Sequence, residues 1–296
     1  MESLEPDEEA ALLKKLPRTG HVIYLGDLVG KAKLDKWVRE QKLAFIKEHA
    51  GKMGLSEELL RRLDLVKRGY FIETLPQAAQ KSMLEERVAE GIRRFRALRT
   101  LSSADILAGN KEVHATQLGY PVDRQYKKLE TDSVRFHWRP TSRETENLFV
   151  LAVPSGNYGK MRVVLNRLKK EARRAQAEGK AVVLLTHHNP FFGPFGMALK
   201  PRQIKGVAVR LISEDDLGRA KFLRQLAREM RADYIFCGHR HEPLFGKMIG
   251  VLPQEQHSFK WFTKMGGERK EVPVIYLQEG LVARVSDERR PRIELF

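Results

Sequence analysis

Five side chains that can bind metal ions stand directly after apolar runs of the sequence. Asp27 and Asn110 each follow a glycine, His187 follows a threonine, and His239 and His241 come just after another glycine. In layered α/β proteins, ligands bind at the carboxyl ends of strands, where the backbone turns away from the sheet and glycine permits a tight turn. Alternation places His239 and His241 on one side of the chain, where their imidazoles could face two nearby cations. The sequence therefore predicts a metal site built from four strand ends.

The elements that would position these side chains are short apolar strands that alternate with longer helices, a pattern typical of an α/β fold. Most of the apolar runs are too uniform for strands wetted on one face, so we expect them to lie inside layered sheets. The predicted strands cover residues 21–27, 104–110, 133–138, 148–156, 181–188, 233–239, 273–280 and 291–296. A helical insertion is predicted over residues 31–103, and a further helix over residues 161–180.

Composition bounds the class of protein. With 296 residues and 42% apolar content, residues 1–296 can form a single domain with a sizeable core. No uncharged apolar run approaches the roughly 20 residues that span a bilayer, and we expect a cytoplasmic protein without a membrane partner. The single cysteine, Cys237, excludes an internal disulfide and lies in an apolar run, so we expect a small buried side chain.

The formal net charge of +16 favours anionic partners such as nucleic acid, nucleotides or an acidic protein surface. Basic residues cluster at Arg93–Arg99, Arg167–Arg174 and Lys260–Lys270. The first two clusters fall in helical patterns, where a solvated helix face is the simplest interpretation.

Four segments carry a resemblance to a known family. The motifs YLGDLVG, LAGNKE, LLTHHNPF and FCGHRHEP occur in the order and strand context of the metal-binding motifs of calcineurin-like metallophosphoesterases, and they span Asp27 to His241. The resemblance implies a β-sandwich flanked by helices, with one or two divalent ions such as Mn, Fe or Zn. It implies that Asp27 bridges two ions, that Asn110, His187 and His239 hold one of them, and that His241 binds the other. The implied activity is hydrolysis of a phosphate monoester or diester, or of a nucleotide or nucleic acid, by a metal-activated water.

Two departures from the family pattern leave alternatives open. The first motif of the family, Asp-x-His, does not occur. We expect that the protein begins upstream of Met1, that it works with one metal, or that it no longer hydrolyses a substrate. Lys111 stands where the family has a histidine; it can contact phosphate as a point charge but is a poor proton donor at neutral pH. His188 and His114 are the nearby candidates for an acid, although packing or support of the ligands explains His188 equally well.

A different class of function competes with catalysis. A non-catalytic module could keep the fold and the basic surface to dock nucleic acid or a protein. Phe191, Phe192 and Phe195 could stack on a base or simply pack. Four histidines lie away from the four strand ends and are assigned no role: His21, His49, His137 and His257.

Overall fold

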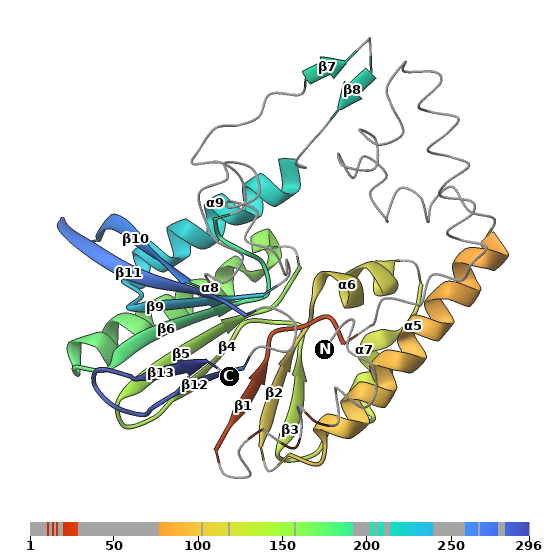
Figure 1. Ribbon diagram of the computed structural model, residues 1–296, viewed down its shortest axis with the longest axis horizontal. Coiled ribbons are helices and arrows are strands. Elements are labelled where there is room, and N and C mark those ends of the chain that lie inside the picture. Colours follow the sequence, from red (N-terminus) through yellow and green to blue (C-terminus); the bar gives the residue numbers. More distant parts are fainter. Residues whose placement is uncertain are drawn as a thin grey trace.

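Figure 1 shows the computed structural model of the chain, which describes residues 11, 14, 16, 20–28, 77–101, 103–117, 119–156, 158–191, 202–204, 207–209, 214–238, 258–265, 267–277 and 282–295. Its elements in chain order are β1 (Val22–Tyr24), α5 (Gln77–Leu98), β2 (Ala104–Leu107), α6 (Asn110–Gln117), α7 (Val122–Lys127), β3 (Val134–His137), β4 (Thr141–Glu144), β5 (Leu148–Val153), α8 (Tyr158–Ala177), β6 (Ala181–Thr186), β7 (Arg202–Ile204), β8 (Val207–Val209), α9 (Glu214–Glu229), β9 (Tyr234–Cys237), β10 (Ser258–Met265), β11 (Glu268–Tyr276), β12 (Ala283–Val285) and β13 (Ile293–Leu295). Every predicted strand segment overlaps one of these strands, and the mixed α/β class is confirmed.

Two sheets carry the architecture. The first has the order β1-β2-β3 and is parallel throughout. The second has the order β10-β11-β9-β6-β5-β4; its central pairs are parallel, and its two edge strands, β10 and β4, pair antiparallel. Two short antiparallel pairs, β12 with β13 and β7 with β8, complete the described strands.

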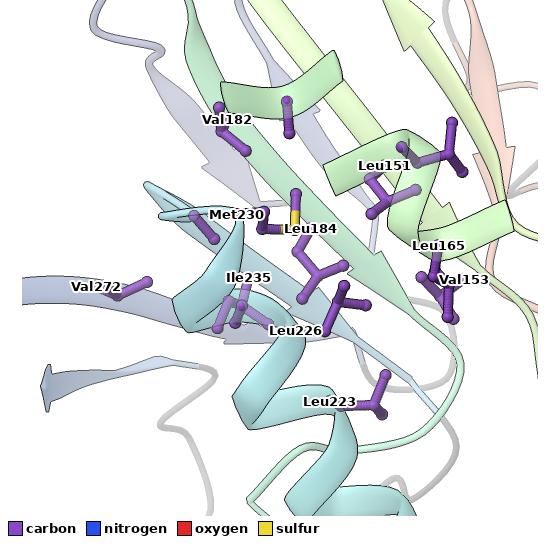
Figure 2. Close-up of a cluster of buried hydrophobic side chains, with 14 of the residues drawn as sticks. Leu151, Val153, Leu165, Val182, Leu184, Leu223, Leu226, Met230, Ile235 and Val272 are labelled. Atoms are coloured by element: carbon purple, nitrogen blue, oxygen red, sulfur yellow. The ribbon is translucent and has the colours of Figure 1, made fainter. Parts of the chain in front are cut away.

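The two larger sheets face each other, and helices cover their outer faces (Figure 1). Leu107 of the first sheet packs with Leu185, Phe236 and Ile275 of the second. On the outer face of the second sheet, α8 and α9 bury a larger cluster in which Leu165 and Leu226 meet the strands (Figure 2). On the outer face of the first sheet, side chains of α5 and α7 form a third cluster with β2 and β3.

Amphipathic patterning explains which helix faces are buried. In α8, Met161, Leu165, Leu168 and Ala172 recur at helical spacing and are buried, while the intervening lysines and arginines face outward. The expected solvated face therefore holds for this helix. The cluster in α5 differs, because Arg94 is only 3% exposed and its charge is balanced by Glu90 at 3.0 Å.

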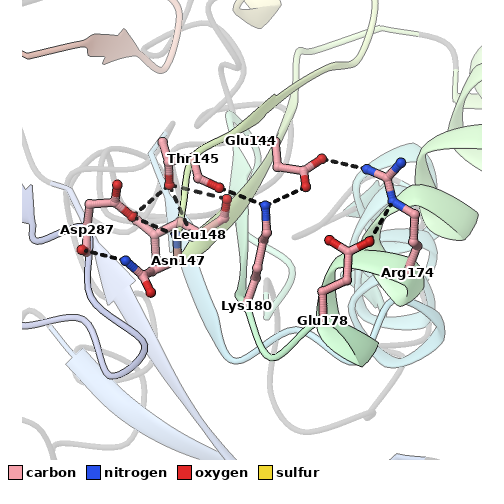
Figure 3. Close-up of polar contacts among 8 residues, drawn as sticks. All are labelled: Glu144, Thr145, Asn147, Leu148, Arg174, Glu178, Lys180 and Asp287. Atoms are coloured by element: carbon pink, nitrogen blue, oxygen red, sulfur yellow. Dashed lines mark hydrogen bonds and ion pairs between the residues drawn. The ribbon is translucent and has the colours of Figure 1, made fainter.

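Polar contacts tie the β4–β5 edge to its neighbours (Figure 3). Glu144 at the end of β4 accepts hydrogen bonds from Arg174 of α8 and from Lys180, at 2.7 and 2.6 Å. Asp287, between β12 and β13, accepts from the Thr145 hydroxyl and the Asn147 N–H. These bonds attach a strand with no apolar residue of its own, β4, and also anchor the β12–β13 turn.

Other expectations can be compared with this fold. Cys237 is fully buried in β9, as expected, and burial raises the pKa of its thiol. Of the predicted helical insertion over residues 31–103, the structure describes α5, and the segment before residue 77 lies outside the described residues. None of the described helices is long and apolar enough to cross a membrane.

The first sheet contains a charged cluster that joins all three of its strands. Asp105 of β2 accepts hydrogen bonds from His21, which precedes β1, at 2.7 Å and from His137 of β3 at 2.6 Å. Burial alone would raise the pKa of the Asp105 carboxyl. The hydrogen bonds from His137 and His21 outweigh burial, so this pKa lies well below its usual range. Two of the histidines without an assigned role, His21 and His137, thus hold a partly buried carboxylate across the sheet.

This cluster generates a prediction about stability. The stabilisation from a carboxylate with a lowered pKa is fully present above the unfolded-state value of about 3.9 and is lost as the pH falls below it. We therefore expect Asp105→Asn to lower the free energy of unfolding by about 1–3 kcal/mol at pH 7. In urea unfolding, its difference from the original protein should shrink between pH 5 and pH 3. Asp132→Asn, at an exposed position, should change stability by less than about 0.5 kcal/mol. A stability difference between Asp105→Asn and the original protein that grows toward low pH would contradict the prediction.

Candidate metal site at the strand ends

The predicted strand ends meet at one edge of the two sheets. β1 and β2 pair in parallel, as do β5, β6 and β9, so each group of strands ends at one edge. A hydrogen bond of 2.7 Å from the Ser155 N–H to the Ala108 carbonyl joins the end of β5 to the end of β2. The His187 Nδ1 lies 2.7 Å from the Leu25 carbonyl and joins β6 to β1. The structure therefore brings together Asp27, Asn110, Lys111, His187 and His188.

Two glycines allow the ends of β1 and β2 to touch. A Cβ atom at Gly26 would lie 2.7 Å from the Cα of Gly109, and a Cβ at Gly109 would lie 2.1 Å from Oδ1 of Asp27. Neither side chain would fit without moving backbone. Gly26 also has a φ of +104°, which L-residues rarely adopt. The glycines before Asp27 and Asn110 are therefore required by close approach as well as by turning.

Glu112 fastens the same two turns. Its Oε2 accepts the N–H of Gly109 at 2.7 Å and the N–H of Asp27 at 3.1 Å, and the residue has no solvent exposure. Gly109 is the residue before α6, and Glu112 is the third residue of that helix. The bond between the Gly109 N–H and the Glu112 carboxylate is therefore one half of a capping box, in which a glutamate at N3 accepts the N-cap amide. Glu112 was not among the residues predicted for the site, although its spacing from Gly109 is the signal that could have revealed it.

Three side-chain acceptor atoms converge beside this clamp. The Leu25 carbonyl can only accept a hydrogen bond, so His187 carries a proton on Nδ1. Its Nε2 accepts the N–H of Asn110 at 3.3 Å and therefore presents a lone pair. Oδ1 of Asn110 lies 3.0 Å from Nε2, and Oδ1 of Asp27 lies 3.6 Å from it. In the tautomer with its proton on Nδ1 all three atoms are acceptors, and a cation bound among them would offset their mutual repulsion.

The chemistry of this donor set fits a divalent metal ion. A carboxylate oxygen, an amide oxygen and an imidazole nitrogen suit Mn²⁺, Fe²⁺ or Zn²⁺. Bonds of about 2.0–2.2 Å place neighbouring ligands of one ion about 3–3.6 Å apart. The separations of 3.0 and 3.6 Å fall within this range. The Leu25 carbonyl behind His187 is the kind of outer partner that orients a metal-binding imidazole.

The described residues supply only part of the predicted ligand set. Among them, no three His, Cys, Asp or Glu side chains converge on a point that could hold a metal ion, and the third donor here is Asn110. His239 and His241 lie outside the described residues. The backbone leads toward the site, however, because Gly238 donates to the Thr186 carbonyl at 3.2 Å, directly before His187.

Lys111 and His188 occupy different positions in this arrangement. The N–H of Lys111 donates to Oδ1 of Asp27 at 3.1 Å, and its Nζ lies 3.9 Å from Oδ2 of the same carboxylate. His188 is buried, contacts Ser155 Oγ through Nε2 at 2.7 Å and meets the Tyr158 ring edge-on. His188 is thus a buried residue whose ring packs against the ring of His187.

The other sequence candidates lie at the margin of the site or beyond it. The Phe191 ring packs against Trp261 with 5.0 Å between ring centroids, an arrangement that serves packing. Phe192 and Phe195 lie outside the described residues, and so does the His114 side chain. Residues 154–156 follow β5 and lead toward α8.

The close approach of the two turns generates a second prediction. Gly109→Ala places a methyl group where Asp27 now lies, so we expect it to lower the free energy of unfolding by more than about 2 kcal/mol. Gly218→Ala is the matched control, because Gly218 is an exposed position of α9 with no atom near its added Cβ. There the same substitution should raise stability by about 0.5–1 kcal/mol. Thermal or urea unfolding measures both, and equal effects would contradict the structure.

Comparison with known proteins adds no relative. No protein-family model matches the chain, and no curated protein matches it either. The chemical interpretation of the strand-end site therefore rests on its residues and their geometry.

Proposed function

We propose that the protein is a metal-dependent phosphoesterase that hydrolyses a phosphate monoester or diester. The observation that carries the proposal is the convergence of Asp27 Oδ1, Asn110 Oδ1 and His187 Nε2 at the ends of parallel strands. The proposal includes the finer fold, a metallophosphoesterase-like sandwich. Two facing sheets with helices on their outer sides support it.

In this proposal Asp27, Asn110 and His187 hold a divalent ion, and His239 and His241 are expected to add ligands. A bound ion would supply a nucleophilic water and stabilise charge on the phosphoryl oxygens. The chain prepares the donors in advance: the Leu25 carbonyl fixes the His187 tautomer, and Glu112 fixes the backbone of Asp27. Such fixed outer partners lower the cost of assembling a metal site.

Lys111 is proposed to contact the substrate phosphate. Its ammonium lies at the outer oxygen of Asp27, so the site holds a positive charge before any ion binds. This charge would attract a phosphate oxygen, but it would also compete with a metal ion for the carboxylate. We therefore propose a single divalent ion, with Lys111 supplying the second positive charge.

The third prediction tests the ligands. Purified protein should bind a single Mn²⁺ ion per chain by calorimetric titration and elemental analysis. It should hydrolyse p-nitrophenyl phosphate or bis(p-nitrophenyl) phosphate only with the metal present. Asp27→Asn, which keeps a residue that tolerates the φ of +61° at this position, should lower metal affinity and kcat/KM by at least about a hundredfold, and His187→Gln should do the same.

Asp123→Asn provides the control, because it removes an acidic charge at an exposed position of α7. It should leave both metal affinity and turnover unchanged. Turnover that is independent of metal, or that survives in Asp27→Asn, would refute the proposal.

The fourth prediction concerns Lys111. Lys111→Met keeps the apolar stem and removes a charge 3.9 Å from Asp27, so Mn²⁺ should bind about fivefold more tightly. Inorganic phosphate should inhibit hydrolysis less strongly in this variant. Lys127→Met, at an exposed position, should change neither quantity. Weaker metal binding in Lys111→Met would show that the lysine supports the ion instead of competing with it.

One observation favours the alternative, a non-catalytic binding module. The Lys111 ammonium can neutralise Asp27 without any metal ion, which would leave a basic α/β scaffold that docks nucleic acid or a protein. A protein that neither binds Mn²⁺ nor hydrolyses either ester would support this second function.

A further inference from the structure

A basic groove lies away from the strand-end site. It has a volume of about 910 Å³ and is bounded by the carboxyl-terminal parts of α8 and α9 and by the tip of the β10–β11 hairpin. None of its lining residues belongs to the strand-end site. Its cationic lining residues are Arg173, Arg228, Arg231, Lys264, Arg269 and Lys270, and its acids are Glu229 and Glu268.

The acids of the molecule do not cancel this charge. Glu229 binds the Lys169 ammonium and the Gln225 amide, and the Lys169 bond holds the pKa of its carboxyl below the usual range. Lys270 is paired with Asp233 at 2.7 Å. Within the described residues, the remaining five cations of the groove form no ion pair with an acid, so a net positive field is built into this surface.

Two cations also lie opposite each other in the strand pairing at the tip of the hairpin. Lys264 of β10 lies directly opposite Arg269 of β11, and both side chains are exposed. Like charges at directly opposed positions destabilise an antiparallel pair. An anion bound between Lys264 and Arg269 would offset this repulsion. The pairing of two cations is therefore easier to explain if the hairpin tip binds an anion.

An exposed aromatic ring lies on the same hairpin. Phe262 is 56% exposed, and the guanidinium of Arg269 lies 5.7 Å from the centre of its ring. Surfaces for single-stranded nucleic acid combine cations that follow the phosphates with aromatic rings on which unpaired bases stack. An acidic peptide has no base to stack, and a duplex keeps its bases paired.

We propose that this groove and the hairpin tip form a binding surface for single-stranded nucleic acid, separate from the metal site. Arginines predominate among its cations, and their planar guanidinium groups can bind phosphate oxygens in pairs. Within the described part of the groove, the contacts are to phosphate and ring surfaces, so binding should be insensitive to base sequence. The surface is independent of the proposed hydrolysis, because it uses none of the same side chains.

The fifth prediction tests this surface by fluorescence anisotropy of a labelled 20-nucleotide single strand of mixed sequence. EDTA is present throughout, so the metal site plays no part. Lys264→Gln combined with Arg269→Gln should weaken binding about tenfold and lower the salt dependence of log Kd by about 1.4, the value for two lost phosphate contacts. The thermal unfolding midpoint of this double variant should equal or exceed that of the original protein, because the repulsion between Lys264 and Arg269 has been removed. Phe262→Ala should weaken binding at least about fivefold for the single strand and less for a duplex of the same sequence.

The control is Lys127→Gln combined with Lys128→Gln, which removes the same charge at two exposed positions, the last residue of α7 and its C-cap. Helix α7 lies on the other side of the molecule from the hairpin (Figure 1). The control variant should retain full binding. Equal weakening by the two double variants would overturn the proposal, because overall charge would then explain the binding. Tighter binding of the duplex or of a poly-glutamate peptide would also overturn it.

Discussion

The strand-end site depends on one buried carboxylate. Oε2 of Glu112 accepts backbone N–H groups from Gly109 and from Asp27, residues that lie in different strand ends 82 positions apart. A buried carboxylate is costly unless hydrogen bonds compensate its lost hydration. Separation of the two turns would leave the charge with fewer donors, so the carboxylate couples their positions. The contact of Gly26 with Gly109, and the placing of Asn110 beside His187, require the turns to stay together.

The sequence predicts those parts of the fold that follow from local patterns. Uniformly apolar runs predicted the buried strands, and their polar ends predicted the residues that meet at one edge. The edge strands of the six-stranded sheet, β4 and β10, were missed for physical reasons. β4 consists of Thr141–Glu144 and is held by ion pairs, while β10 alternates Trp261, Thr263 and Met265 with Lys260, Phe262 and Lys264, so that it resembles a basic cluster. The His21–Asp105–His137 cluster was missed because it arises from the register of three parallel strands, which no local pattern encodes.

The net charge of a protein is a poor measure of how many cations have no acidic side chain nearby to balance them. Several of the basic residues behind the formal charge of +16 have internal acids: Arg94 is balanced by Glu90, and both Arg174 and Lys180 bind Glu144. Such pairs project little field into solvent. The groove differs because its acids are engaged by other groups or outnumbered. The location of uncompensated cations, which only the fold reveals, therefore says more about an anionic partner than the total does.

The backbone of Asp27 is strained, and residues of another segment hold the strain in place. A non-glycine residue at a φ of +61° costs about 1 kcal/mol or more and persists only where the surroundings enforce it. Here the enforcing groups come from the first turn of α6: Glu112 holds the Asp27 N–H, and the Lys111 N–H holds its Oδ1. Asp27 is thus aimed at His187 by residues of another segment, and its own strand supplies only the approach. A change in residues 109–112 would therefore alter the strand-end site even where it leaves every proposed ligand in the sequence.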